Sequence, residues 1–524
     1  MVAMRWKWVL AALGLAAMPV YATPGYDVVE KSLSDLNRDL TAGKVKSEEL
    51  VQAYQARIAA LNPSLHAVIA LNPKAIDEAR AADALRKSGA KLGPLAGIPI
   101  LLKDNIESSD GTATTAGSLA LKSNTTLRDS PVSANLKAAG AIILGKTNLS
   151  EWANIRSEHS ISGWSAVGGQ TRNPYVLDRS PCGSSSGSGA AAAASLAAAA
   201  IGTETDGSIT CPASVNGLVG LKPTVGLVSR TRIVPISHSQ DTAGPMARSV
   251  TDAAVILSAL AGSDPKDAAT VLADAHRADY TRFLKTTALA GVRVGVMRFS
   301  AGFHPETEIV FNKAIETLKA LGAVPVEITE FPNKVDVGPA ELFELITELK
   351  VDLNAYLATT DPRKVPARTL ADVIAFDKSH RNEEMSYFQQ ELFDKSQDTG
   401  GLGDEKYQKA ISDIRQASGP SGIDAMLKTN DVAVLIAPTL GPAWLIDSVL
   451  KDNFVGGSAG SVAAIAGYPH LSVPMGQVAG LPVGLSFIGP AWSEGALLGY
   501  GYSFEQAAHA RLPPQYLPTI EQPR

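Results

Sequence analysis

Residues 183–212, GSSSGSGAAAAASLAAAAIGTETDGSITCP, constrain the fold of this chain more than any other stretch. They begin with serines between glycines, continue through an alanine-rich segment without a charged residue, and end in a second Gly-Ser turn at 206–208. Alanine and leucine favour helix, and an uncharged segment has no polar face to expose to water. The pattern predicts one buried helix between two serine-bearing turns, where hydroxyls and unhindered backbone N–H groups suit acyl chemistry.

Two other interpretations of this stretch are weaker. A flexible Gly/Ser linker is seldom followed directly by an uninterrupted apolar segment. Residues 183–187 also satisfy G-x-S-x-G, the nucleophile elbow of α/β-hydrolases, which would make Ser185 the nucleophile. That motif requires a strand immediately upstream, whereas the preceding NPYVLDRSPC is an irregular run with two prolines.

Further motifs are spread along the chain on both sides of this stretch. They are GIPILLKDN at 97–105, GKTNLSEWA at 145–153, NPY at 173–175, PCGSSSGSGA at 181–190, GTETDGSITCPASVNGLVGLKPTVGLVSR at 202–230, QDTAGPMARSV at 240–250, and GYPHLSVPMG with GLPVGLSFIGP within 467–490. In content and order this set resembles the amidase-signature family of serine hydrolases. The resemblance spans nearly the whole chain after residue 22.

The resemblance implies an α/β fold, a single large domain in which helices cover both faces of a mixed central β-sheet. The pattern of the chain agrees, because apolar runs that indicate strands alternate with helical segments. We expect two amphipathic helices within 26–61, the second from about residue 47, and a helix over 306–321. Strands are expected at 98–103, 141–145, 292–297, 324–328 and 432–437.

The family uses a Ser-Ser-Lys triad, and its motifs place that triad on Lys103, Ser184 and Ser208. A serine hydroxyl is a poor nucleophile until a base takes its proton. A lysine serves as that base only when it is neutral, which requires burial to lower its pKa. Lys103 suits this role because it follows the apolar run 98–102, which is typical of a buried strand.

The resemblance also assigns the steps of the reaction. Ser208 attacks the amide carbonyl, and Ser184 passes the proton between Ser208 and Lys103 from a loop with a cis peptide bond between Gly183 and Ser184. Water then hydrolyses the acyl-enzyme, without a metal or an organic cofactor. The oxyanion is expected to bind backbone N–H groups, which the family motif places at Thr205, Asp206, Gly207 and Ser208.

Two departures from the common family pattern narrow the function. Asp206 stands where many members have glycine, and Thr210-Cys211 stands where many have arginine after the nucleophile. The TETDGS version resembles the branch with bacterial peptide amidases, which predicts release of ammonia from peptide C-terminal amides. Alternatives are a general aliphatic or aryl acylamidase and, less favoured because all three triad residues are present, a catalytically silent binding protein.

The first 22 residues predict a signal peptide. Arg5 and Lys7 precede an apolar run at 8–20, and the small-residue pattern predicts cleavage after Ala22. We therefore expect a periplasmic or secreted enzyme without stable membrane insertion, which disfavours a tRNA amidotransferase subunit. Residues 23–524 are expected to form one domain. Its charged helical insertion at about 332–430 is either a substrate cap or a peripheral decoration.

The net charge of the chain indicates which classes of binding partner to expect. The formal net charge is −5 without a basic cluster, which argues against a nucleic-acid partner. The expected partners are a small-molecule or peptide amide and water.

Cys182 and Cys211 lie near the proposed catalytic serines in the sequence. Two buried thiols are favoured over a disulfide, although an oxidising compartment permits one.

Candidate substrate contacts come from short segments near the triad motifs. They are Ser162, Gly163, Trp164 and Ser185, with Tyr468 and Phe487 nearby. Aromatic side chains in such positions belong more often to the core than to a pocket.

Overall fold

The computed structural model describes residues 25–457 and 459–520 of the 524-residue chain. The predicted signal peptide at 1–22 lies outside these residues. None of the helices in the described part of the chain has the length and apolar composition required to cross a bilayer.

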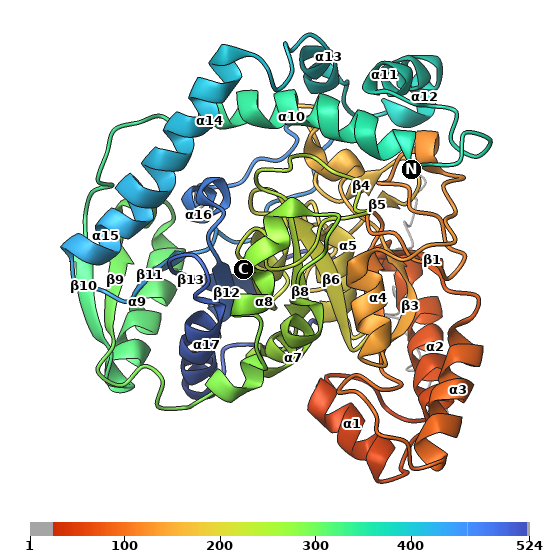
Figure 1. The fold of residues 1–524 in the computed structure, drawn as a ribbon. Coiled ribbons are helices and arrows are strands. Elements are labelled where there is room, and N and C mark those ends of the chain that lie inside the picture. Colours follow the sequence, from red (N-terminus) through yellow and green to blue (C-terminus); the bar gives the residue numbers. More distant parts are fainter. Residues whose placement is uncertain (1–24, 458, 521–524) are drawn as a thin grey trace, which may run out of the picture.

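One mixed sheet of eleven strands forms the centre of the molecule (Figure 1). The strand order is β1-β3-β2-β6-β8-β7-β12-β13-β11-β9-β10. Parallel pairing joins β2 to β3 and β6, and β9 to β10 and β11, while the other pairs are antiparallel. The strands are β1 Val68–Leu71, β2 Pro99–Lys103, β3 Ile142–Thr147, β6 Ala199–Glu204, β7 Val219–Lys222, β8 Thr242–Ala247, β9 Arg293–Met297, β10 Val324–Ile328, β11 Val434–Pro438, β12 His470–Val478 and β13 Leu481–Ile488.

Helices pack against this sheet on both faces, as the sequence predicts. One group, α5 and α6, contacts the strands β2, β6, β7 and β12, and α4, α7, α9 and α17 form a second group that also packs on the sheet. The helices are α4 Pro131–Ala138, α5 Ser186–Ala193, α6 Thr210–Val215, α7 Val250–Leu260, α9 Pro305–Ala320 and α17 Glu494–Ala508. The fold is therefore the predicted single large α/β domain.

Local sequence patterns locate many of these elements. The two predicted N-terminal helices are α1 Leu33–Thr41 and α2 Ser47–Leu65, followed by α3 Ala75–Lys87. The five predicted strands correspond to β2, β3, β9, β10 and β11, and the predicted helix at 306–321 is α9. Continuous apolar runs explain the success for β2, β3 and β11, because these strands are buried along their whole length.

The prediction of one helix through the alanine-rich stretch is wrong. Helix α5 ends at Ala193, the chain turns at Ser195 with a φ of 54°, and the second half of the stretch is strand β6. Tertiary hydrogen bonds stabilise this end, since Arg57 donates to the Ala194 carbonyl and Arg248 to the Ala192 carbonyl. The whole stretch is buried as predicted, but tertiary packing overrides the helix preference of alanine.

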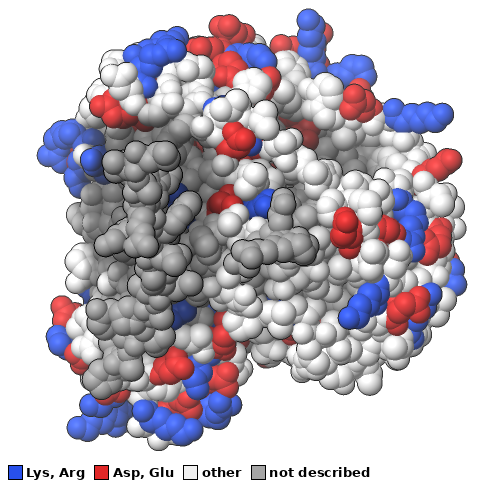
Figure 2. Space-filling model, turned by 180° about the vertical axis from the view of Figure 1, so that it is seen from behind, with Lys and Arg blue, Asp and Glu red and all other residues white. Residues whose placement is uncertain are grey.

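The segment 332–430 forms a helical layer along one edge of the molecule, at the top of Figure 1. It contains α10 Gly338–Ala358, α11 Leu370–Ser379, α12 Arg381–Glu384, α13 Glu391–Gln397, α14 Glu405–Ser418 and α15 Asp424–Thr429. Its apolar side chains share a hydrophobic cluster with Trp152, Val234 and Ile236 from loops of the main body. Acidic and basic side chains are interspersed on the face of the molecule in Figure 2.

Central strand β2 gives a direct test of this packing. We expect Leu101→Ala, which removes a fully buried side chain, to lower the free energy of unfolding by about 2–5 kcal/mol. The control Leu127→Ala changes a side chain that is 88% exposed, and we expect a change within about 0.5 kcal/mol. Urea unfolding followed by fluorescence measures both, and equal losses in the two variants would contradict the assigned core.

Candidate active site

A fully buried lysine lies at the end of central strand β2. Lys103 Nζ is 2.8 Å from Ser184 Oγ, 2.8 Å from Thr203 Oγ1 and 3.3 Å from the Thr203 carbonyl oxygen. These three partners are uncharged, and β2 and β6 are neighbouring strands that hold Lys103 and Thr203 side by side. Burial lowers the pKa of Lys103 to about 7, although Asp241 and Glu204 act in the opposite direction.

The hydrogen-bond geometry around this amine fits its neutral form. A neutral primary amine has two N–H donors and one lone pair. The Thr203 carbonyl can only accept, and Thr203 Oγ1 also accepts a hydrogen bond from Asn105 Nδ2 at 3.0 Å. With both N–H groups directed to Thr203, the lone pair remains for the hydroxyl of Ser184.

Ser184 occupies a tightly packed loop. The peptide bond between Gly183 and Ser184 is cis, and the Ser184 carbonyl accepts a hydrogen bond from the Ser150 N–H. A Cβ at Gly183 would lie 2.1 Å from Ser150 Oγ, so only glycine fits at this position. This packing fixes the Ser184 hydroxyl against Lys103.

Ser208 lies in the loop between β6 and α6, next to the Ser184 loop. Its carbonyl accepts a 3.1 Å hydrogen bond from the Ser185 N–H, which joins the two serine loops directly. Ser208 is 8% exposed, whereas Lys103 and Ser184 are fully buried. A Cβ on neighbouring Gly207 would meet no atom within 4 Å, so open space adjoins this loop. A ligand can therefore approach Ser208 more readily than the other two side chains.

Buried carboxylates hold the loop that contains Ser208. Glu204 Oε2 accepts hydrogen bonds from the N–H groups of Ile209 and Thr210, at 2.7 and 2.9 Å. The Thr205 hydroxyl donates to Asp241 at 2.6 Å. Within residues 25–457 and 459–520, the N–H groups of Asp206, Gly207 and Ser208 donate to no other residue and are available to a ligand.

The predicted substrate contacts differ in their surroundings. Ser185 is fully buried, and its hydroxyl donates to the Thr203 carbonyl and accepts from the Thr203 N–H, so it ties α5 to β6 instead of facing a ligand. Trp164 packs edge-on against Phe388 and Tyr387 and is 5% exposed. These two side chains are part of the packed interior.

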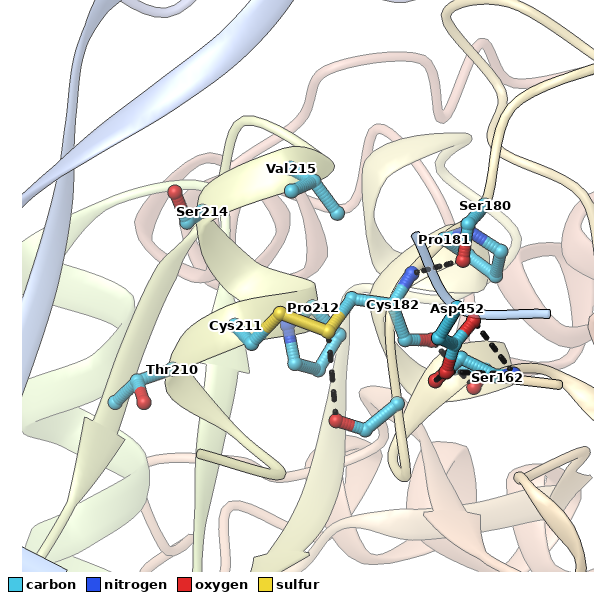
Figure 3. The surroundings of a disulfide bond; sticks show 12 residues. Ser162, Ser180, Pro181, Cys182, Thr210, Cys211, Pro212, Ser214, Val215 and Asp452 are labelled. Atoms are coloured by element: carbon cyan, nitrogen blue, oxygen red, sulfur yellow. Dashed lines mark hydrogen bonds between the residues drawn. A yellow bond between two sulfur atoms is a disulfide. The ribbon is translucent and has the colours of Figure 1, made fainter. Parts of the chain in front are cut away.

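Ser162 and Gly163 lie closer to the serine loops. The Ser162 hydroxyl donates to Asp452 at 2.6 Å, and the Gly163 N–H donates to Ser150 Oγ at 2.9 Å (Figure 3 shows the Ser162–Asp452 contact). A Cβ at Gly183 would be 3.1 Å from Ser162 Oγ, which places Ser162 beside the cis peptide. Of the more distant aromatics, Tyr468 donates to Asp424, and Phe487 is buried against Phe504.

Cys182 and Cys211 form a disulfide bond (Figure 3), so the expectation of two free thiols is wrong. Their Cα atoms are 6.1 Å apart although 29 positions separate them in the sequence. The reason is the contact between the two serine loops, which the sequence spacing does not show. The bond therefore links the loop of Ser184 covalently to the helix that follows Ser208.

Several residues of this site carry no role in the sequence analysis. Thr203, Asn105, Asp241 and Glu204 all lie within the family motifs, yet only their position around Lys103 and the Ser208 loop shows what they contact. Asp452 lies in no motif. Thr203, Asn105 and Glu204 are buried, and Asp241 and Asp452 are half-buried, which depends on the tertiary fold.

A mixed α/β sheet with a buried lysine that contacts a loop of serines defines the class of amidase-signature folds, and comparisons with known proteins agree. The amidase family model matches residues 49–498. A probable amidase of Arabidopsis thaliana is 39% identical over 96% of this chain and 94% of its own length. The crystal structure of native peptide amidase from Stenotrophomonas maltophilia is 51% identical, with a TM-score of 0.89 over 93% of this chain and 99% of that one.

A structure of the peptide amidase PAM with the competitive inhibitor chymostatin is 50% identical, with a TM-score of 0.90 over 94% of this chain and all of the other. The chain therefore belongs to the amidase family. It is an enzyme that hydrolyses amides.

The disulfide leads to a testable difference between oxidised and reduced protein. We expect the intact mass of non-reduced enzyme to be about 2 Da below that of the reduced enzyme. Closing a loop of this length stabilises the folded state by about 3–4 kcal/mol in the chain-entropy account. The Cys182→Ser/Cys211→Ser double variant should show this loss in urea unfolding, and identical masses with and without reduction would contradict the bond.

Proposed function

We propose that this amidase works through Lys103, Ser184 and Ser208, with an acyl-enzyme on Ser208. The observation that carries the proposal is the 2.8 Å contact between the fully buried Lys103 and Ser184, in a loop hydrogen-bonded to Ser208. In this scheme Ser208 Oγ bonds to the amide carbon while its proton passes to Ser184, and the Ser184 proton passes to Lys103 Nζ.

The tetrahedral intermediate then places its negative oxygen against the free N–H groups of the Ser208 loop, for which we propose Thr205, Asp206, Gly207 and Ser208. Its collapse breaks the C–N bond, and the proton returns from Lys103 through Ser184 to the leaving nitrogen. Water then attacks the ester on Ser208 by the same relay, which releases the acid and restores the serine.

For the substrate we propose peptide C-terminal amides, which yield ammonia and a peptide acid. The support is the identity of 51% with a peptide amidase over nearly the full length. A general aliphatic or aryl acylamidase of the same mechanism is the second candidate, because the proposed chemistry acts on the amide group and is the same for any acyl group. A panel of peptide amides and anilides distinguishes the two by the product released.

We also propose a periplasmic or secreted location. It is supported by the pattern of the first 22 residues and by the disulfide, which is typical of oxidising compartments. A location outside the cytosol also separates the enzyme from tRNA-dependent amidotransfer, and we propose no nucleic-acid partner.

Separate substitutions of Ser208 and Ser185, which lie in two hydrogen-bonded loops, test which serine is the nucleophile. We expect Ser208→Ala to abolish release of ammonia from a peptide amide, because no oxygen remains to form the acyl-enzyme. Ser185→Ala is the matched control, since it removes a buried hydroxyl that bonds only to the backbone of Thr203. It should retain activity within about tenfold, reflecting the loss of its two hydrogen bonds to the Thr203 backbone. Loss in Ser185→Ala with an active Ser208→Ala would refute the assignment.

The pH dependence tests the base. The reactive form of Lys103 is the neutral amine, so kcat/KM should rise with pH and reach half of its plateau near pH 7. Lys103→Ala should lower the plateau by several orders of magnitude, because a triad loses most of its effect when one member is removed. Steady-state hydrolysis between pH 5 and 9 measures both, and a flat wild-type profile argues against the lysine base.

A further inference from the structure

The longest helix of the segment 332–430 reaches the loop that contains Ser208. Glu341, in the first turn of α10, accepts a 2.9 Å hydrogen bond from Gln240 Nε2. The same amide donates to the Thr205 carbonyl at 3.2 Å. Two hydrogen bonds therefore connect α10 to the first residue of the proposed oxyanion loop.

Glu341 also contacts the side chain of Asp206 in this loop. The two carboxyl groups are close enough for each to change the pKa of the other, and Ser461 lowers the pKa of Asp206. Asp206 Oδ1 is buried and has no N–H or hydroxyl donor elsewhere in the described part of the chain. Two carboxylates in contact repel each other when both are ionised, whereas one shared proton converts the repulsion into a hydrogen bond.

The surrounding charges indicate which carboxyl holds the proton. Burial raises the pKa of Glu341 to about 9, with the negative charges of Asp206 and Glu344 as further causes. Burial and then Glu204 raise the pKa of Asp206 to about 6, while Lys222 lowers it. At neutral pH the proton therefore belongs to Glu341, which donates, and Asp206 accepts.

This arrangement matters because Asp206 is part of the loop whose N–H groups at 206–208 donate to no other described residue. Its carboxylate would repel a developing oxyanion if it turned toward the substrate. A donor on α10 would restrain this carboxylate, and Gln240 binds both Glu341 and the Thr205 carbonyl of the same loop. Ionisation of Glu341 would remove the donor and add a second negative charge beside the loop.

We propose that Glu341 is a positioning residue of this amidase, which fixes the oxyanion loop by donating its proton to Asp206. The inference rests on the proposed function, since it takes the loop at 205–208 as the oxyanion site. It gives the segment 332–430 a part in the reaction. That segment supplies the donor that orients the loop, and Glu341 itself touches no reacting atom.

The test uses Glu341→Gln, Glu341→Leu and the control Glu405→Gln, each assayed on whichever amide the wild type hydrolyses. In the wild type, kcat should fall as the pH rises through about 9, as Glu341 ionises. Glutamine keeps a neutral donor, so Glu341→Gln should keep kcat at pH 7 within about threefold and lose this alkaline fall. Glu405→Gln, which changes an exposed carboxyl in the first turn of α14 in the same segment, should keep the wild-type profile.

Leucine supplies no donor, so Glu341→Leu should lower kcat by about 10- to 100-fold with little change in KM, because oxyanion binding acts in the transition state. An unchanged alkaline fall in Glu341→Gln overturns the inference, and so does wild-type kcat in Glu341→Leu. If Glu341→Leu does not fold, the pH dependence of kcat in Glu341→Gln is the deciding measurement. If Ser208→Ala is inactive and Glu341→Gln keeps the wild-type pH dependence of kcat, only the inference about Glu341 is rejected. If Ser208→Ala is active, the proposed mechanism is rejected.

Discussion

The burial of Lys103 without a charged partner is the constraint on which the rest of the site depends. A buried ammonium loses its hydration, and in the described part of the chain no carboxylate is among the groups that contact Nζ. Burial therefore lowers the pKa of Lys103 to about 7, which favours the neutral amine that the proposed mechanism requires. The neighbouring strands β2 and β6 maintain this state by bringing Lys103 Nζ to 2.8 Å from Thr203 Oγ1 inside the sheet.

The remaining features hold two loops against this amine. A backbone hydrogen bond and the Cys182–Cys211 bond join the loop of Ser184 to that of Ser208. Glu204 fixes the following helix, and α10 reaches the same loop through Glu341. Carboxylates therefore hold the Ser208 loop, since Glu204 accepts from the N–H groups of Ile209 and Thr210 and Asp241 accepts from the Thr205 hydroxyl. Among the described residues, none accepts from the N–H groups of 206–208, which remain available to a substrate.

Sequence patterns predict the local parts of this structure well. Apolar runs locate β2 and β3, and the family motifs point to Lys103, Ser184 and Ser208. The helix through 183–203 is wrongly predicted because Arg57 and Arg248, which terminate it, lie far away in the sequence. The disulfide and the contact of Glu341 with Asp206 were beyond prediction for the same reason, since both depend on how distant segments meet in the fold.

The central claim is that a neutral Lys103 draws the proton from Ser208 through Ser184. The rate at which a fluorophosphonate labels Ser208 measures this step without an amide substrate, since the P–F bond breaks and fluoride leaves without needing a proton from the enzyme. The account predicts a rate in the wild type that rises with pH to a plateau, with its midpoint near pH 7, and a slow rate without this midpoint in Lys103→Met. Labelling of Lys103→Met at the wild-type rate and with the same midpoint would contradict the account.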